Sequence, residues 1–346
     1  MRKAAFLLYG LIPYLMLQPA ATQPAPQDDP MHLRMNVVLV QLSVAVIDSK
    51  GNYVTGLRPE NFEVTEDKIP QKISSFDEGS GDELGPTDGT PPDHLSNAPA
   101  SSPAQIQRVD SFEPAETIAN AGPHANEASV FVLFDTSNYM YRSFVFAQDA
   151  ITDFIRSMNN ASRIAFYSYC RDLSRAMQLT SDHFRIVNAV RSTVAGDDAA
   201  LYNSLLLTVK DAAPLKGRKA IVVFSNGPDN ASSVPPEDVA ELAQSSGTII
   251  YIISTRQAEE DPASAAAFER MSKVSGGKAY FAKNWLDEKK AFSSIREDLV
   301  HLYTLSYYPQ SNPNRGWRSI KVRLVGKDMQ KYHLRTRDGY RLAAQR

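Results

Sequence analysis

The sequence predicts an α/β fold, in which a doubly wound, mostly parallel sheet of six strands is joined to a small β-sandwich-like domain. Between residues 128 and 308, short apolar runs alternate with segments whose apolar residues recur every three or four positions. This alternation is typical of parallel strands connected by helices. Residues 35–76 and 309–346 instead alternate with a period of two, which indicates half-buried strands.

The amino-terminal segment, residues 1–21, has the pattern of a secretory signal peptide. Arg2 and Lys3 precede an apolar run that is too short to span a bilayer comfortably. An uncleaved amino-terminal anchor is the alternative. Residues 22–34 are rich in Pro, Gln and Asp and predict a flexible leader. We therefore expect a protein that is secreted or held in the periplasm or cell envelope, with no membrane span in the mature chain.

Two segments of opposite character follow the leader. Residues 35–76 predict a small β domain, because apolar residues alternate strictly from Val38 to Val46 and two shorter strand patterns come after a turn. Residues 77–127 contain ten acidic residues, one arginine and seven prolines, with little apolar content. Such a segment cannot bury enough apolar surface to offset its chain entropy, so we expect a disordered acidic linker.

The α/β pattern occupies residues 128–308. We expect strands at 129–134, 163–170, 219–224, 248–254, 278–282 and, as the sixth, 304–308, with helices at 143–158, 181–193, 200–213, 235–244, 262–275 and 287–302. In residues 309–346, strand patterns recur at 319–324 and 330–337. These late strands should complete the early β domain, because neither half alone has enough strands for a stable sandwich.

Composition excludes several classes of function. The chain has 346 residues and a net charge of −2, so no overall field attracts nucleic acid. Its single cysteine, Cys170, permits no intramolecular disulfide. The sequence contains no His-Glu-x-x-His, no Gly-x-Ser-x-Gly and no phosphate-binding glycine loop, and no histidine is spaced as a partner for Cys170. We therefore expect a protein that is not an enzyme.

A polar loop follows the first apolar strand pattern of the α/β segment. It reads Asp135-Thr-Ser137-Asn-Tyr139-Met and resembles the first metal-site loop of von Willebrand factor type A domains, whose pattern is Asp-x-Ser-x-Ser. Tyr139 stands where the second serine would be. A type A domain has a Rossmann-like sheet, and Asp135 would lie at the carboxyl end of a central strand, where open α/β sheets place their ligands.

A second resemblance covers the β patterns at both ends. Asp48-x-x-Gly-x-x-Val-x-Gly-Leu, Phe62-x-Val-x-Glu66-Asp67 and the later Leu-Arg-Thr-Arg-Asp-Gly-Tyr340 are similar to signatures of secreted, type A-related proteins abundant in Acidobacteria. The match is a signature of turns and core positions, and it implies no chemistry of its own.

The resemblance to type A domains implies a metal-ion-dependent adhesion site. Three loops hold one divalent ion, usually Mg²⁺, and an acidic side chain of a partner protein completes its coordination. Here Ala199 takes the threonine position of the second loop, and Asn226 replaces the aspartate of the third. The candidate metal ligands are Asp135, Ser137, Asp197, Asp198, Asn226 and Asp229. Because only Asp135 and Ser137 match the family pattern, we expect a degenerate site that binds Mg²⁺ weakly or not at all.

These observations favour an exported binding module that mediates protein–protein or surface interaction. A scaffold protein of the cell envelope without a metal site is the first alternative. An unrecognised hydrolytic enzyme is the second.

Overall fold

The computed structural model describes residues 39–79, 128–158, 162–255 and 261–342, all of which fall in one unit of the chain, 38–346. The expected signal peptide, the leader and most of the expected acidic linker lie outside these residues. No helix within the described ranges is long and apolar enough to cross a membrane.

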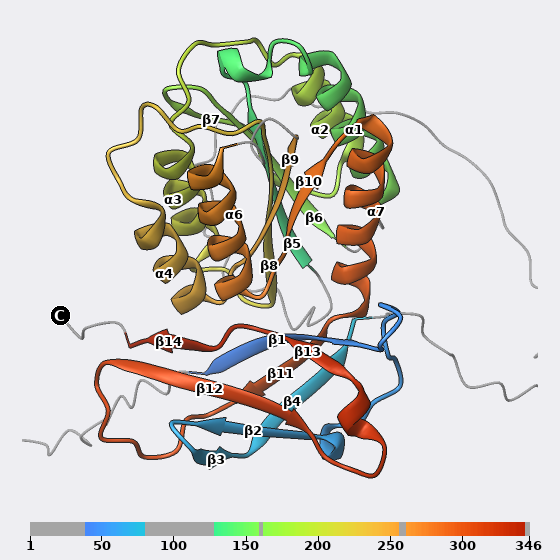
Figure 1. Cartoon of the computed structure of the whole chain (residues 1–346), viewed down its shortest axis with the longest axis vertical. Coiled ribbons are helices and arrows are strands. Elements are labelled where there is room, and N and C mark those ends of the chain that lie inside the picture. Colours follow the sequence, from blue (N-terminus) through green and yellow to red (C-terminus); the bar gives the residue numbers. More distant parts are fainter. Residues whose placement is uncertain (1–38, 80–127, 159–161, 256–260, 343–346) are drawn as a thin grey trace, which may run out of the picture. The chain divides into compact units, whose positions relative to one another are not determined.

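Six strands form the central sheet, in the order β10-β9-β8-β5-β6-β7 (Figure 1). All neighbours are parallel except β6 and β7, which are antiparallel. The strands are β5 (Ala128–Asp135), β6 (Arg163–Tyr169), β7 (Leu173–Thr180), β8 (Arg218–Ser225), β9 (Ile249–Thr255) and β10 (Ala279–Ala282). The helices are α1 (Phe144–Ser157), α2 (His183–Arg191), α3 (Leu201–Ala212), α4 (Pro236–Ser246), α6 (Pro262–Ser275) and α7 (Trp285–His301).

Two apolar layers sandwich this sheet. On one face, side chains of α1, α2 and α7 pack on β5, β6, β8 and β9. On the other face, α3, α4 and α6 pack on the same strands. All eight residues of β5 are buried because the strand is covered from both sides, which is why its sequence is a continuous apolar run. The predicted α/β fold class is confirmed.

The sixth strand of the sheet is not the predicted one. Residues 304–308 were expected there, but β11 (Tyr303–Tyr307) pairs with β1 (Val40–Ile47) in a different sheet. The sixth strand is β7, an antiparallel edge strand in which half of the residues are exposed. Its mixed polar sequence lacks the apolar run of a buried parallel strand, whereas all five residues of β11 are buried although Thr304 and Ser306 are polar.

Two four-stranded antiparallel sheets form a sandwich below the α/β body (Figure 1). Their orders are β13-β1-β11-β4 and β14-β12-β2-β3, with β2 (Phe62–Glu66), β3 (Ile69–Gln71), β4 (Ile73–Glu78), β12 (Trp317–Leu324), β13 (His333–Arg335) and β14 (Gly339–Arg341). Strands from both ends of the chain therefore pair, as predicted: β2 with β12 and β1 with β13. One apolar core unites the two sheets.

Three details of the sandwich differ from the sequence prediction. β4 continues to Glu78, two residues into the segment expected to be linker. The strand expected over 330–337 is shorter, because the 3₁₀ turn η3 (Met329–Lys331) precedes it and β13 covers only His333–Arg335. β3 and β14 were not predicted, since three residues are too few to show a period.

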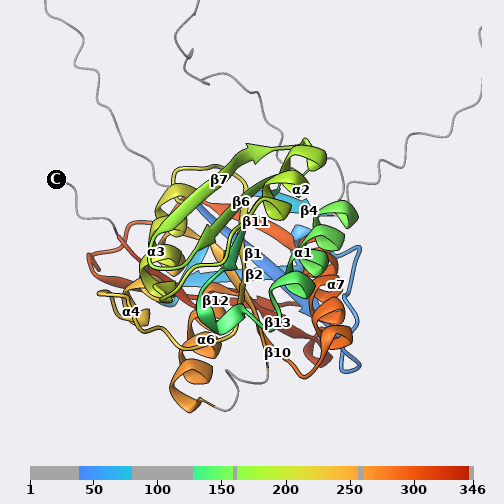
Figure 2. The same ribbon diagram turned by 90° about the horizontal axis from the view of Figure 1, so that it is seen from above.

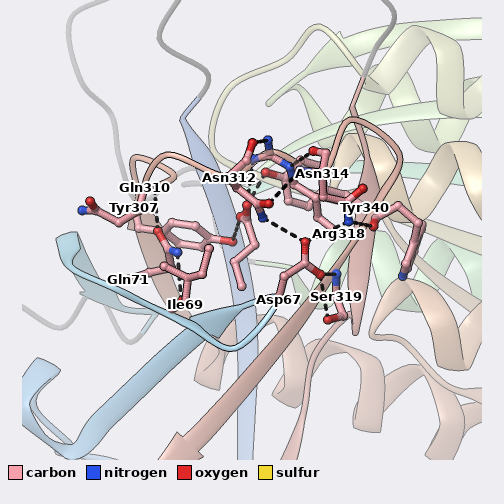
Figure 3. A network of polar contacts seen from close by, with 12 residues as sticks. Asp67, Ile69, Gln71, Tyr307, Gln310, Asn312, Asn314, Arg318, Ser319 and Tyr340 are labelled. Atoms are coloured by element: carbon pink, nitrogen blue, oxygen red, sulfur yellow. Dashed lines mark hydrogen bonds and ion pairs between the residues drawn. The ribbon is translucent and has the colours of Figure 1, made fainter.

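A polar network connects the two ends of the chain inside the sandwich (Figure 3). Glu66 is fully buried and accepts hydrogen bonds from Arg318 (2.8 Å), Tyr307 (2.9 Å) and Tyr340 (3.0 Å). The next residue, Asp67, accepts the side-chain amides of Asn312 and Asn314 and both the amide and the hydroxyl of Ser319. Because every bond joins segments far apart in sequence, the two acidic residues fasten the late strands to the early ones.

Two arginines attach the sandwich to the α/β body. Arg335 of β13 pairs with the buried Asp298 of α7 and donates to the Gly276 carbonyl at the end of α6 (2.7 Å). Arg337 donates to the Gln244 carbonyl in the last turn of α4. A cation is favourable at a helix carboxyl terminus, where unpaired carbonyls carry partial negative charge. Both contacts lie at the amino edge of the central sheet, because α4 and α6 end just before β9 and β10 begin.

Replacing Arg335 by Met should destabilise the fold strongly. The substitution leaves the buried Asp298 carboxylate without its cation, which typically lowers the free energy of unfolding by about 3–5 kcal/mol. The matched control is Arg323→Met, whose pair with Glu63 is exposed and should contribute less than about 1 kcal/mol. Urea unfolding of both variants tests this. Equal effects would show that the Asp298–Arg335 pair does not hold the two bodies together.

The Asp67 network predicts a specific sensitivity to acid. Burial raises the pKa of Asp67, but hydrogen bonds from Asn312, Ser319 and Asn314 outweigh it and lower the pKa to about 2, from 3.8. A carboxyl group whose folded pKa is lowered contributes its stability above the unfolded value and loses it as the pH falls through the folded value. Thermal unfolding should therefore show stability lost between about pH 4 and pH 2, with a smaller loss in Asp67→Asn. An identical loss in that variant would contradict this.

Candidate functional site

Three loops meet at the carboxyl edge of the central sheet, opposite the edge that the sandwich contacts. Loop one (residues 136–141) follows β5, loop two (196–200) precedes α3, and loop three (226–231) follows β8. Together with the terminal residues Asp135 and Ser225 they form what we call the rim. Figure 2 looks down on this edge. β5 and β8 are parallel neighbours, so their carboxyl ends lie side by side.

Asp135 is the centre of the rim. Its carboxylate is buried and accepts the Ser137 amide (2.9 Å) and the Ser225 hydroxyl (2.7 Å). The Tyr169 hydroxyl in turn donates to Ser225 (3.0 Å), so a chain of hydrogen bonds runs from β6 through β8 to β5. Burial raises the pKa of Asp135, and the donated hydrogen bonds only partly offset this. Both carboxylate oxygens are therefore engaged.

Ser137 and Asn226 each carry a buried oxygen that has no partner among the described residues. Ser137 begins the short 3₁₀ turn η2 (Asn138–Met140), and its Oγ is unpaired. Asn226 is 3% exposed; its Nδ2 donates to the Tyr139 carbonyl (3.0 Å), while its Oδ1 is unpaired. These two neutral oxygens are the open acceptors of the rim.

The two acidic residues of the second loop lie at its outer side. Asp198 forms an ion pair with Arg171 and accepts a hydrogen bond from the side-chain amide of Asn230 (3.3 Å). The hydrogen bond from the Arg171 guanidinium, together with its positive charge, lowers the pKa of Asp198. Asp197 is exposed, and only its backbone carbonyl takes part in the rim, where it accepts the Asn138 amide (2.8 Å). Neither carboxylate is joined to Asp135.

Asp229 has a structural role. One carboxylate oxygen accepts the Tyr202 amide in the first turn of α3 (2.9 Å), and the other accepts the Ser232 amide (2.8 Å). A carboxylate in this position satisfies a free amide at the helix start and faces the positive end of the helix dipole. Asp229 is therefore a helix-capping residue.

The donor set fits a divalent cation poorly. Mg²⁺ prefers carboxylate oxygens in an octahedral arrangement, and Asp135 is the one carboxylate at the centre of the rim. Of the six predicted ligands, Asp198 and Asp229 are engaged by Arg171 and by α3, and Asp197 faces solvent. Within the described ranges, no group of three or more His, Cys, Asp or Glu side chains is placed to hold a metal ion. Two neutral oxygens and one hydrogen-bonded carboxylate remain.

Several residues of the rim were not singled out from the sequence. Ser225 and Tyr169 orient Asp135, and Asn230 accepts the Ala199 amide (2.8 Å). Arg171 neutralises Asp198. A polar residue at the end of an otherwise apolar strand was the available signal for Ser225. For Arg171 and Asn230 the sequence offered none, because their roles depend on which loops lie together.

Comparison with known proteins gives a family match in the α/β body. Residues 129–294 match the family model of the von Willebrand factor type A domain. That range begins in β5 and ends in α7, so it contains all six strands of the central sheet and every loop of the rim. A comparison with curated proteins gave no match.

Solved structures with partial similarity include three proteins. A conserved hypothetical protein, BatB from Bacteroides thetaiotaomicron, is 15% identical (TM-score 0.42; 50% of this chain, 97% of that chain). The vWF domain of the type V pili tip protein Mfa5 from Porphyromonas gingivalis is 11% identical (TM-score 0.43; 49% and 94%). Proximal thread matrix protein 1 from the mussel byssus, with a zinc-occupied MIDAS motif, is 11% identical (TM-score 0.42; 54% and 48%).

Calorimetric titration of the full chain with MgCl₂ or MnCl₂ should give no binding in the micromolar range. One engaged carboxylate and two neutral oxygens cannot replace the hydration shell of Mg²⁺ favourably. Asp135→Asn is the matched control, because it removes the charge and keeps the shape. A binding heat with a micromolar dissociation constant that disappears in Asp135→Asn would contradict a rim that fits Mg²⁺ poorly.

Proposed function

We propose that this chain is an interaction module that binds a protein partner at its rim, because residues 129–294 match the family model of the von Willebrand factor type A domain. The observation that carries the proposal is the position of the sandwich. It contacts the amino edge of the sheet through Arg335 and Arg337, so no part of the sandwich covers the carboxyl edge. A role in binding rather than catalysis is favoured because the carboxylates of Asp135, Asp198 and Asp229 are engaged in structural hydrogen bonds or an ion pair.

Exposed apolar side chains border the rim. They are Tyr141, Val145, Phe146 and Val194, of which Phe146 is 64% and Val194 80% exposed. The Tyr141 hydroxyl donates to the Gly196 carbonyl (3.0 Å), and Gln148 of α1 donates to the Val190 carbonyl of α2 (2.9 Å), so loop two lies against loop one and the end of α2 lies against α1. Large apolar side chains gathered at one exposed place favour contact with another protein.

The partner need not supply an acidic side chain. In the resemblance to type A domains, such a side chain is bound through the metal ion. Here the rim has few ligands for that ion, and its border is apolar. We propose that apolar contacts at α1, with hydrogen bonds from the rim, carry the recognition, and that any Mg²⁺ contribution is small.

We further propose that the protein acts outside the cytoplasm, as the charged start and apolar run of residues 1–21 indicate. Membership of the secreted acidobacterial family is proposed on the signatures at both ends of the chain. The support for this membership is one hydrogen-bond network in the sandwich that joins the signatures. Glu66 of one signature accepts hydrogen bonds from Tyr340 of another and from Arg318, and Asp67 accepts the Ser319 amide.

Partner capture tests the proposal. The chain without residues 1–21, immobilised, is exposed to an envelope extract, and proteins retained by wild type are compared with those retained by Phe146→Ser. The control is Phe184→Ser, which is 74% exposed at the start of α2, near the opposite edge of the sheet. Capture lost in Phe146→Ser and kept in Phe184→Ser supports binding at the rim. Equal capture by all three would favour the scaffold alternative, in which the rim is inert.

A further inference from the structure

The three loops of the rim are already joined to one another in every pairwise combination. Loops one and two are joined by the Asn138 amide on the Asp197 carbonyl (2.8 Å) and the Gly196 amide on the Thr136 carbonyl (2.7 Å). Loops two and three are joined by the Asn230 amide on the Ala199 carbonyl (3.0 Å). The resemblance to type A domains implies that an ion held by all three loops would connect them. Here backbone groups make two of these connections.

Asn226 makes the third connection. Its side-chain amide donates to the Tyr139 carbonyl (3.0 Å) and so joins loop three to loop one. A carboxylate at this position has no hydrogen to donate, so aspartate could not form this bond. The asparagine therefore does more than remove a metal ligand: it supplies a donor that aspartate lacks. Because Asn226 is 3% exposed, the bond is shielded from water.

Tyr139 of loop one and Ala199 of loop two also take part in hydrogen bonds between the loops. Tyr139 takes part through its backbone carbonyl, so its side chain need not provide a hydroxyl near Asp135. Ala199 takes part through both backbone groups, with its amide on Asn230 Oδ1 (2.8 Å) and its carbonyl receiving the Asn230 amide. The three positions that depart from the type A pattern, Tyr139, Ala199 and Asn226, thus all contribute to hydrogen bonds between loops.

We infer that the rim is held in one arrangement by its own hydrogen bonds, with the Asn226 amide in the place of a bridging cation, so that its structure and stability do not respond to divalent cations. Partner binding at the rim is then constitutive and is not switched by Mg²⁺ or Ca²⁺. The inference concerns the rim itself, and its test needs no partner. It can therefore fail while the proposed binding function stands, or stand while that function fails.

Thermal unfolding of the full chain in EDTA and in millimolar MgCl₂ tests the inference. The wild-type Tm should be the same in both. Asn226→Asp loses the donated hydrogen bond and brings a second carboxylate to the edge that holds Asp135, so its Tm in EDTA should fall by about 3–8 °C. Asn226→Ala loses the same bond without adding charge and should also fall. Asn188→Asp, an exposed position in the last turn of α2, is the matched control, and its Tm should fall less than that of Asn226→Asp and be the same in EDTA and in MgCl₂.

The outcomes divide cleanly. A cation-insensitive wild type together with destabilised Asn226→Asp and Asn226→Ala supports the inference, and recovery of Asn226→Asp alone in MgCl₂ adds that the amide and an ion are interchangeable there. A wild-type Tm that rises with MgCl₂ overturns it. An Asn226→Asp variant that is as stable in EDTA as wild type also overturns the inference, because the hydrogen bond from Asn226 to the Tyr139 carbonyl would then make no contribution to stability.

Discussion

The attachment of the β sandwich to the amino edge of the central sheet is the constraint on which the rest of the structure depends. Arg335 of β13 contacts the carboxyl terminus of α6 and neutralises the buried Asp298, and Arg337, between β13 and β14, contacts the carboxyl terminus of α4. Helix carbonyls and a buried carboxylate are strong hydrogen-bond acceptors for a guanidinium. Since the attachment uses one edge of the sheet, the opposite edge is left as the face formed by the three loops.

The rim satisfies a buried carboxylate with donors of the protein itself. Asp135 lies at the end of β5, where the hydroxyl of Ser225 and the amide of Ser137 donate to its oxygens. The neighbouring acidic residues are engaged elsewhere, by Arg171 and by the start of α3. Burial of a lone carboxylate is unfavourable unless it is hydrogen-bonded, and these donors meet that requirement within the protein.

Much of the fold could be predicted from sequence because its strands differ in how they are buried. β5, β8 and β9 are covered on both faces and read as apolar runs, while β1 and β12 alternate because their two faces meet different surroundings. β7 escaped prediction since an exposed edge strand resembles a loop in composition. β11 was assigned to the wrong sheet, because a buried strand has the same pattern whichever neighbours it pairs with. Pairing is a property of the folded chain that hydrophobic period does not encode.

For the candidate site, the sequence predicted where the central acidic residue lies but not which groups its neighbours contact. The position of Asp135 at the end of a central strand followed from the apolar run before it. The roles of Asp198 and Asp229 did not, because an ion pair and a helix cap depend on segments brought together only by folding. Asn226 was predicted as a candidate metal ligand in place of an aspartate, whereas in the structure its side-chain amide donates to the Tyr139 carbonyl.

Hydrogen–deuterium exchange of the full chain tests most directly whether the hydrogen bonds between the loops hold the rim in one arrangement without a divalent cation. The amides of Asn138, Gly196 and Asn230 report on the connections between the loops. They should exchange slowly, and at the same rate in EDTA as in millimolar Mg²⁺. Protection that appears at these three amides only when Mg²⁺ is added would contradict the account.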